Sequence, residues 1–132
     1  MTVATRTLIE DDRLVIVLCT NDNVSANETA ALKVDVTTLA KSASGLSCTG
    51  VKINKIWSTT HGMEIQVLWD ATTDVFAWAI PQNTNYLMDF SQFGGLTNNA
   101  GAGKTGNILF TTLDGAAGDM YSVILECIKT YG

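Results

Sequence analysis

The sequence predicts an all-β domain, an antiparallel β-sandwich of jelly-roll or Greek-key type with eight or nine strands. Glycine, asparagine, aspartate and threonine interrupt the chain about every eight to fifteen residues, and the segments between them are rich in valine, isoleucine, threonine and aromatic residues. No window of helical length carries a sustained apolar stripe at helical spacing. Without helices to cross over, neighbouring strands pair in opposite directions, and the apolar face of the sheet is buried against a second sheet.

The length of 132 residues suits one domain with a buried core, and the chain contains no internal repeat or linker composition. Residues 1–132 are therefore predicted to form a single β-sandwich. Within it, Thr2–Ile9 has an extended pattern and precedes an acidic turn at residues 10–12. We expect residues 1–10 to act as an N-terminal arm that pairs with a sheet edge on a neighbouring subunit.

The first half of the chain gives several strand predictions. Leu32–Val36 and Met63–Trp69 alternate apolar and polar residues, as in strands with one buried face. For Ala26–Lys33 one or two helical turns are an alternative. Leu14–Cys19 and Val75–Ile80 are apolar on both faces, which predicts central strands covered by a second sheet or by a neighbouring subunit.

The segment Val51–Thr60 has mixed polarity. Strict alternation places Ile53, Lys55 and Trp57 on one face and Ile56 with polar residues on the other, which is typical of a sheet edge or an interface. Three further segments complete the predicted set of strands: Tyr86–Phe90, Asn107–Thr112 and Met120–Lys129.

Charge and composition narrow the function classes. The net charge of −5 predicts repulsion from phosphate backbones and anionic membranes, so we expect neither nucleic acid nor a membrane as a partner. Residues 1–12 lack the apolar stretch of a signal peptide, and no apolar run is long enough to span a bilayer. Only 16% of residues are charged, which favours some apolar surface against another subunit. The isolated cysteines Cys19, Cys48 and Cys127 suggest synthesis in a reducing cytosol, with Cys19 and Cys127 as small buried hydrophobes.

The run Ala100–Thr105 contains Gly-Ala-Gly-Lys-Thr and superficially matches a phosphate-binding P-loop. The first glycine of that motif would have to stand where Asn98 is found. A P-loop also needs a helix immediately after it, whereas Asn107–Thr112 reads as a strand. We therefore interpret this run as a glycine-rich loop between strands.

No combination of residues predicts catalysis, a cofactor or a metal site. The only histidine, His61, precedes Gly62 between two strands, where an exposed turn is expected. Asp70 and Asp74 have a spacing that could offer oxygen ligands to calcium or a pair of hydrolytic carboxylates. Capping of a hairpin turn explains both aspartates without a ligand, so we predict that the chain is not an enzyme.

Aromatic residues and one long loop supply the candidate contact residues. Trp69 and Trp78 lie in apolar strands and are predicted to pack in the core, whereas Trp57 and Phe93 suit a surface or an interface. Residues 93–106 form a glycine- and asparagine-rich stretch of a length that is uncommon unless something orders it. The predicted interface residues are Trp57, Phe93, Gly94, Gly95, Asn98, Asn99 and Lys104.

Five segments resemble a family of small proteins encoded among the head genes of tailed and marine bacteriophages. They are Lys55–Trp57, Leu68–Asp74, Asp89–Gly95, Gly101–Gly106 and Gly118–Glu126. Together they fall between about residues 55 and 129, while the first fifty residues resemble the family only in strand pattern. The resemblance implies a capsid decoration (cement) protein, a β-sandwich that trimerises on the outside of the shell and bridges major capsid subunits. It carries no active residues to transfer.

The predicted role is therefore a structural virion protein, made in the host cytoplasm and located on the capsid surface. Its predicted partners are the major capsid protein and further copies of itself, as a homotrimer. The alternative is a receptor- or carbohydrate-binding module of a phage tail or fibre that uses exposed aromatic residues such as Trp57.

Overall fold

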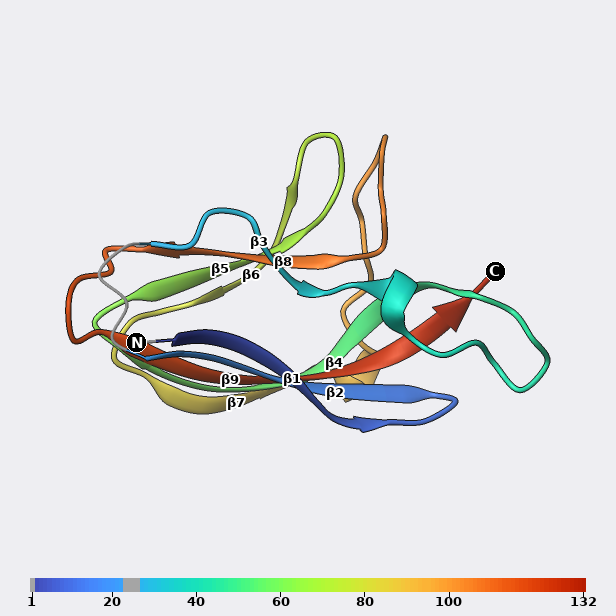
Figure 1. The fold of residues 1–132 in the computed structure, drawn as a ribbon, viewed down its shortest axis with the longest axis horizontal. Helices are drawn as coiled ribbons and strands as arrows, with labels where there is room; N and C mark the ends of the chain where they lie inside the picture. Colours follow the sequence, from blue (N-terminus) through green and yellow to red (C-terminus); the bar gives the residue numbers. More distant parts are fainter. Residues whose placement is uncertain (1, 23–26) are drawn as a thin grey trace.

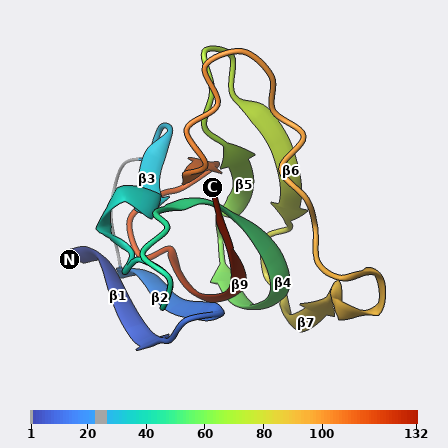
Figure 2. The same ribbon diagram turned by 90° about the vertical axis from the view of Figure 1, so that its right-hand side faces the viewer.

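The structure, a computed structural model, describes residues 2–22 and 27–132. Two antiparallel sheets lie face to face as two layers (Figures 1 and 2). In the five-stranded sheet the strands follow the order β1 (Thr2–Glu10), β2 (Leu14–Asp22), β9 (Met120–Tyr131), β4 (Cys48–His61) and β7 (Asn85–Asp89). In the four-stranded sheet they follow the order β3 (Ala31–Val34), β8 (Ile108–Leu113), β5 (Glu64–Trp69) and β6 (Val75–Ile80).

The predicted all-β sandwich is confirmed. In the described part of the chain the only helical elements are two short 3₁₀ turns, η1 (Val36–Thr38) and η2 (Ser91–Phe93). The helical alternative for Ala26–Lys33 is wrong where it can be checked, because Ala31–Val34 forms β3; Ala26 itself lies outside the described residues. The antiparallel pairing with β8 makes this segment a strand and not a helix.

The core forms where the inward residues of both sheets meet. Strands β2 and β9 bury every second residue, as the two-residue repeat of a strand predicts. Trp69 is 1% exposed and packs in the core as predicted, and Trp78 is half-buried with its ring edge-on to Phe90 at a centroid distance of 5.0 Å. Cys19 and Cys127 are buried core residues, also as predicted.

Strand β4 corrects the alternation that was expected for Val51–Thr60. Its pairing with β9 shifts between Ile53 and Lys55, which marks a β-bulge. The extra residue puts Ile53 and Ile56 on the same buried side, and it turns Lys55 and Trp57 outward. The strand lies between β9 and β7, so the prediction of a sheet edge is wrong.

The expectation that Leu14–Cys19 and Val75–Ile80 lie deep is also wrong in part. Strand β6 is the edge of the four-stranded sheet, and Phe76 on it is 50% exposed. Strand β2 is internal to its sheet, but its outward residues Leu14, Ile16 and Leu18 are only half-buried. Apolar side chains on both faces therefore indicate here an uncovered apolar sheet face, not burial within the chain.

The predicted N-terminal arm extends the chain's own five-stranded sheet. Strand β1 pairs antiparallel with β2 from Thr2 to Glu10; Met1 lies outside the described residues. Hydrogen bonds hold the turn after β1, because Lys129 Nζ donates to Glu10 Oε2 at 2.9 Å and the Tyr131 hydroxyl donates to the carbonyl of Asp12 at 2.6 Å. The segment is thus an edge strand that is anchored at its turn.

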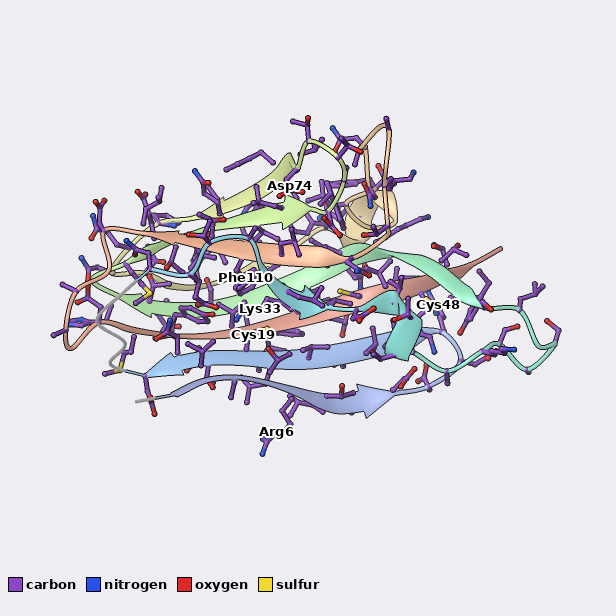
Figure 3. All side chains as sticks on the ribbon, turned by 45° about the horizontal axis from the view of Figure 1, so that its top comes forward. Arg6, Cys19, Lys33, Cys48, Asp74 and Phe110 are labelled. Atoms are coloured by element: carbon purple, nitrogen blue, oxygen red, sulfur yellow. The ribbon has the colours of Figure 1, made fainter. Side chains whose placement is uncertain are left out.

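A buried polar cluster lies between the two sheets near Lys33 (Figure 3). The ammonium group of Lys33 forms an ion pair with Glu28 and lies 5.6 Å from the centre of the Phe110 ring. Glu28 also accepts hydrogen bonds from the Tyr121 hydroxyl at 2.6 Å and from Asn21 Nδ2 at 3.0 Å. These contacts join the segment before β3 to β2 and β9.

Candidate functional site

The outer face of the five-stranded sheet carries a row of apolar side chains. The strand registers place Leu18, Ile124, Trp57 and Leu87 next to one another across β2, β9, β4 and β7. We call these four residues the outer apolar row. Arg6 of β1 continues the row at the sheet edge, and its side chain points away from the body of the protein (Figure 3). The four side chains of the outer apolar row point outward because side chains alternate along a strand, and the residues on either side of each one are buried or pack against the core.

Further apolar residues widen this surface. Ile9 pairs with Ile16 in the neighbouring row, and Ile9 is 55% exposed. Leu14 pairs with Ile128 one row further along the strands. With about 4.8 Å between strands and about 3.3 Å per residue, the face measures roughly 600 Å². Apolar side chains that gather on one exposed face of this kind are characteristic of a protein contact site.

The charges on this face balance, although the chain as a whole is acidic. Three cations (Arg6, Lys52 and Lys55) and three carboxylates (Asp22, Asp89 and Glu126) occupy its outward positions, so their sum is zero. The full chain carries −5. A partner that approaches this face meets no net repulsion, which favours contact with another acidic protein.

A shallow hollow lies beside the indole of Trp57. Its volume is about 330 Å³, and its walls include the outer apolar row together with the polar side chains of Thr59, Asn85 and Ser122. The ammonium group of Lys55 lies 6.0 Å from the centre of the Trp57 ring. An aromatic ring beside an amide and hydroxyl groups is a surface on which a sugar ring can stack and hydrogen-bond.

The four-stranded sheet also has an apolar row on its outer face. Leu32, Leu109, Leu68 and Phe76 are neighbours across β3, β8, β5 and β6. Leu32 and Phe76 are about half exposed, but Leu109 is buried. Both outer faces thus carry four apolar residues in a row, and the five-stranded sheet adds Arg6 on its fifth strand.

A second, polar hollow lies where the glycine-rich loop meets the beginning of β4. Its volume is about 460 Å³. The residues that line it are Thr49, Gly50, Val51, Lys52, Thr97, Asn98, Lys104, Gly106 and Thr130. We call it the polar hollow. The strand β8 follows Gly106 almost directly, so the run that contains Lys104 has no helix after it and is not a P-loop, as predicted.

Internal contacts order the glycine-rich loop. Leu96 and Ile53 exchange backbone hydrogen bonds of 2.7 and 3.1 Å, and the Thr105 hydroxyl donates to Asp70 Oδ2 at 2.7 Å. Gly106 has a φ of +89°, and a side chain there would collide with the carbonyl oxygen of Thr49. The loop that was expected to need a partner is thus held by its own chain.

The structure separates the predicted interface residues into groups. Trp57 belongs to the outer apolar row, whereas Phe93 is 68% exposed on η2 beside Gly94. Gly95 is buried, with Lys52 and Ile53 within van der Waals reach of any side chain added there. Asn98 and Lys104 line the polar hollow together, and Asn99 next to them is exposed.

His61 and the pair Asp70 and Asp74, which were considered for catalysis or metal binding, lie at opposite ends of β5. His61 is exposed at the end of β4, before Gly62 with a φ of +81°, as predicted. Asp74 Oδ1 accepts a hydrogen bond from the backbone of Ala71 at 3.1 Å, which is the expected turn capping. Within residues 2–22 and 27–132, no three histidine, cysteine, aspartate or glutamate residues gather as metal ligands.

The buried thiols have little chemical reactivity. Burial raises the pKa of the Cys19 thiol to about 12, and burial also raises the pKa of the Cys127 thiol. A thiol protonated at neutral pH is a poor nucleophile. Cys48 is also buried and not in a disulfide.

Leu18, Ile124 and Leu87 of the outer apolar row were not singled out from the sequence. The apolar residues on both faces of Leu14–Cys19 were a signal for Leu18. That pattern fits both a strand that is covered on both faces and a strand that exposes an apolar face. Lys52 was also missed as a neighbour of Lys104, because the two are far apart in the chain and the loop reaches β4 through tertiary contacts such as the bridge between Leu96 and Ile53.

No protein-family model matches the chain, and no curated protein is significantly similar to it. Within the part of the chain that the structure describes, no helix is long and apolar enough to cross a bilayer.

Proposed function

We propose that this chain is a structural virion protein, a decoration (cement) protein on the outside of a phage head that contacts major capsid subunits. The observation that carries the proposal is the outer apolar row of the five-stranded sheet, which no other part of the described chain covers. The resemblance of five segments to phage head proteins supports the choice of a capsid over other assemblies. The proposed contact needs no catalytic group.

In this proposal the five-stranded sheet lies against major capsid subunits. Its roughly 600 Å² is comparable with the roughly 800 Å² that each partner contributes to a stable protein interface. Its balanced charge allows contact with an acidic shell in spite of the net charge of −5. Binding across the junction of two capsid subunits stabilises the assembled shell by mass action. The exposed edges and loops remain for contacts with further copies, as in the homotrimer that the resemblance implies.

A binding experiment tests this proposal. Purified protein is added in increasing amounts to phage heads that lack it, the heads are sedimented, and the bound protein is quantified relative to the major capsid protein. We expect saturation at a fixed ratio. Absence of sedimentation with heads, or binding only to purified tails, would contradict the proposal.

The hollow beside Trp57 favours a second candidate, a carbohydrate-binding module at a tail or fibre. Its ring, together with Asn85 and Thr59, forms the kind of platform on which a sugar stacks. Binding to a glycan array that disappears in a Trp57→Ala variant would favour this candidate. A variant Phe93→Ala is the control, because Phe93 is more exposed and does not line that hollow.

A further inference from the structure

We propose that the polar hollow is an oxyanion-binding site that takes a phosphate ion or a carboxylate group of another molecule. This inference does not rest on the proposed function, although Lys52 belongs both to the outer face of the five-stranded sheet and to the hollow. It starts from the run around Lys104, which looks like a phosphate-binding motif in sequence but is not followed by a helix. The fold gives the same lysine a different set of neighbours.

The lining of the polar hollow is rich in hydrogen-bond donors and contains no carboxylate. Two of the eight cationic side chains of the protein, Lys52 and Lys104, line it together with the hydroxyls of three threonines. Neither lysine forms an ion pair with a carboxylate of the described residues. Two unpaired cations on one hollow of an acidic protein attract a small anion.

The edge of β4 adds a backbone donor to this hollow. Ile53 turns both of its backbone groups away from β9 and toward Leu96. Backbone groups repeat their direction every second residue along a strand, so Val51 turns its N–H to the same side. Val51 lines the hollow, and the glycine at position 50 leaves the backbone uncovered there.

The amide group of Asn98 has a donor that lacks a hydrogen-bond acceptor, and this is the most specific sign of an anion site. Its Oδ1 accepts a hydrogen bond from the backbone of Ala100 at 2.9 Å, which fixes the orientation of the amide. Its Nδ2 is buried and has no hydrogen-bond partner among the described residues. A buried donor without a partner costs about 1–3 kcal/mol. Asn98 lines the hollow and is partly exposed, so an anion bound there lies beside an amide whose second donor is unpaired.

Titration of the isotope-labelled protein followed by amide NMR tests the inference. Inorganic phosphate and an acetylated, amidated glutamate are the two probes, each added at constant ionic strength and pH 7. We expect saturable shifts at Val51, Asn98 and Lys104 with a dissociation constant on the order of 1 mM. The probe that saturates at the lower concentration identifies the source of the oxyanion, a free phosphate or a protein carboxylate.

Variants make the test specific. Lys52→Gln and Lys104→Gln are each expected to weaken binding about tenfold, as for the loss of one charge-assisted hydrogen bond. Asn98→Asp keeps the acceptor for Ala100 but replaces the free donor with a negative charge, so it should abolish binding. Lys41→Gln, an exposed lysine outside this hollow, is the control and should bind normally. Shifts that do not saturate with either probe, or that are equal in all variants, would overturn the inference.

Discussion

Replacement of Lys33 by methionine should strongly destabilise the protein. The side chains of Lys33 and Glu28 are 2% and 7% exposed, so the pair is shielded from water. Methionine keeps the apolar stem that packs near Phe110 and removes only the charge. The variant therefore leaves the Glu28 carboxylate buried without its cation.

The magnitude follows from the contacts that remain. Loss of one partner of a buried ion pair costs about 3–5 kcal/mol. Tyr121 and Asn21 still donate to Glu28, so we expect the lower end, about 3 kcal/mol. Domains are stable by only about 5–15 kcal/mol, so this loss is a large share. In the double variant Lys33→Met/Glu28→Gln both charges are absent, and it should be less destabilised than the sum of the two single variants by at least about 1.5 kcal/mol.

Urea unfolding at pH 7, followed by circular dichroism, measures these free energies. The control is Lys41→Met, which changes an exposed lysine and should alter the free energy of unfolding by less than about 0.5 kcal/mol. A loss below about 1 kcal/mol for Lys33→Met, or strict additivity of the two single changes, would refute the reasoning about the buried pair.

Three further predictions concern the loop, the turn after β1 and the cysteines. Gly106→Ala should cost roughly 2–4 kcal/mol in urea unfolding because of its positive φ and close backbone contact, whereas Gly101→Ala, which has open space, should change stability little. A hydrogen bond from Lys129 is the largest effect that holds the pKa of Glu10 below its ordinary value of 4.5. The resulting stabilisation is present above pH 4.5 and disappears as the pH falls through the lowered value, so wild type and Glu10→Gln should differ at pH 7 and converge in acid; a constant difference down to pH 2 would contradict this. The three buried cysteines are Cys19, Cys48 and Cys127. Ellman's reagent should therefore detect no thiol in the native protein and three after unfolding, whereas rapid reaction of the native protein would contradict their burial.

The sequence was sufficient for the fold class and for most strands. Alternation predicted the buried face of Met63–Trp69, because a regular two-residue repeat translates directly into one inward face. Within Leu32–Val36 it gave the wrong face for Leu32 and Lys33, because the register with β8 shifts between Leu32 and Val34, so that Leu32 is exposed and Lys33 is buried beside Val34. It failed at Val51–Thr60, because the bulge after Ile53 reverses the phase within one strand. A bulge depends on the pairing with β9, so local pattern does not reveal it.

The candidate site was predicted less well than the fold. Trp57 was identified because a tryptophan among polar neighbours stands out, but its partners in the outer apolar row depend on the register of four strands. The edge position of β6 was missed for a related reason. Its apolar composition is typical both of a covered strand and of one that presents an apolar surface.

The most direct test of the proposed role is the affinity for heads of two matched variants. Ile124→Glu places a charge in the middle of the outer apolar row, and Leu68→Glu makes the same kind of change on the opposite outer face. Both side chains are half-buried, and thermal unfolding should first establish that both variants fold. We predict that Ile124→Glu no longer sediments with heads while Leu68→Glu binds like wild type. Undiminished binding of a folded Ile124→Glu variant would contradict the claim that this face of the protein makes the contact.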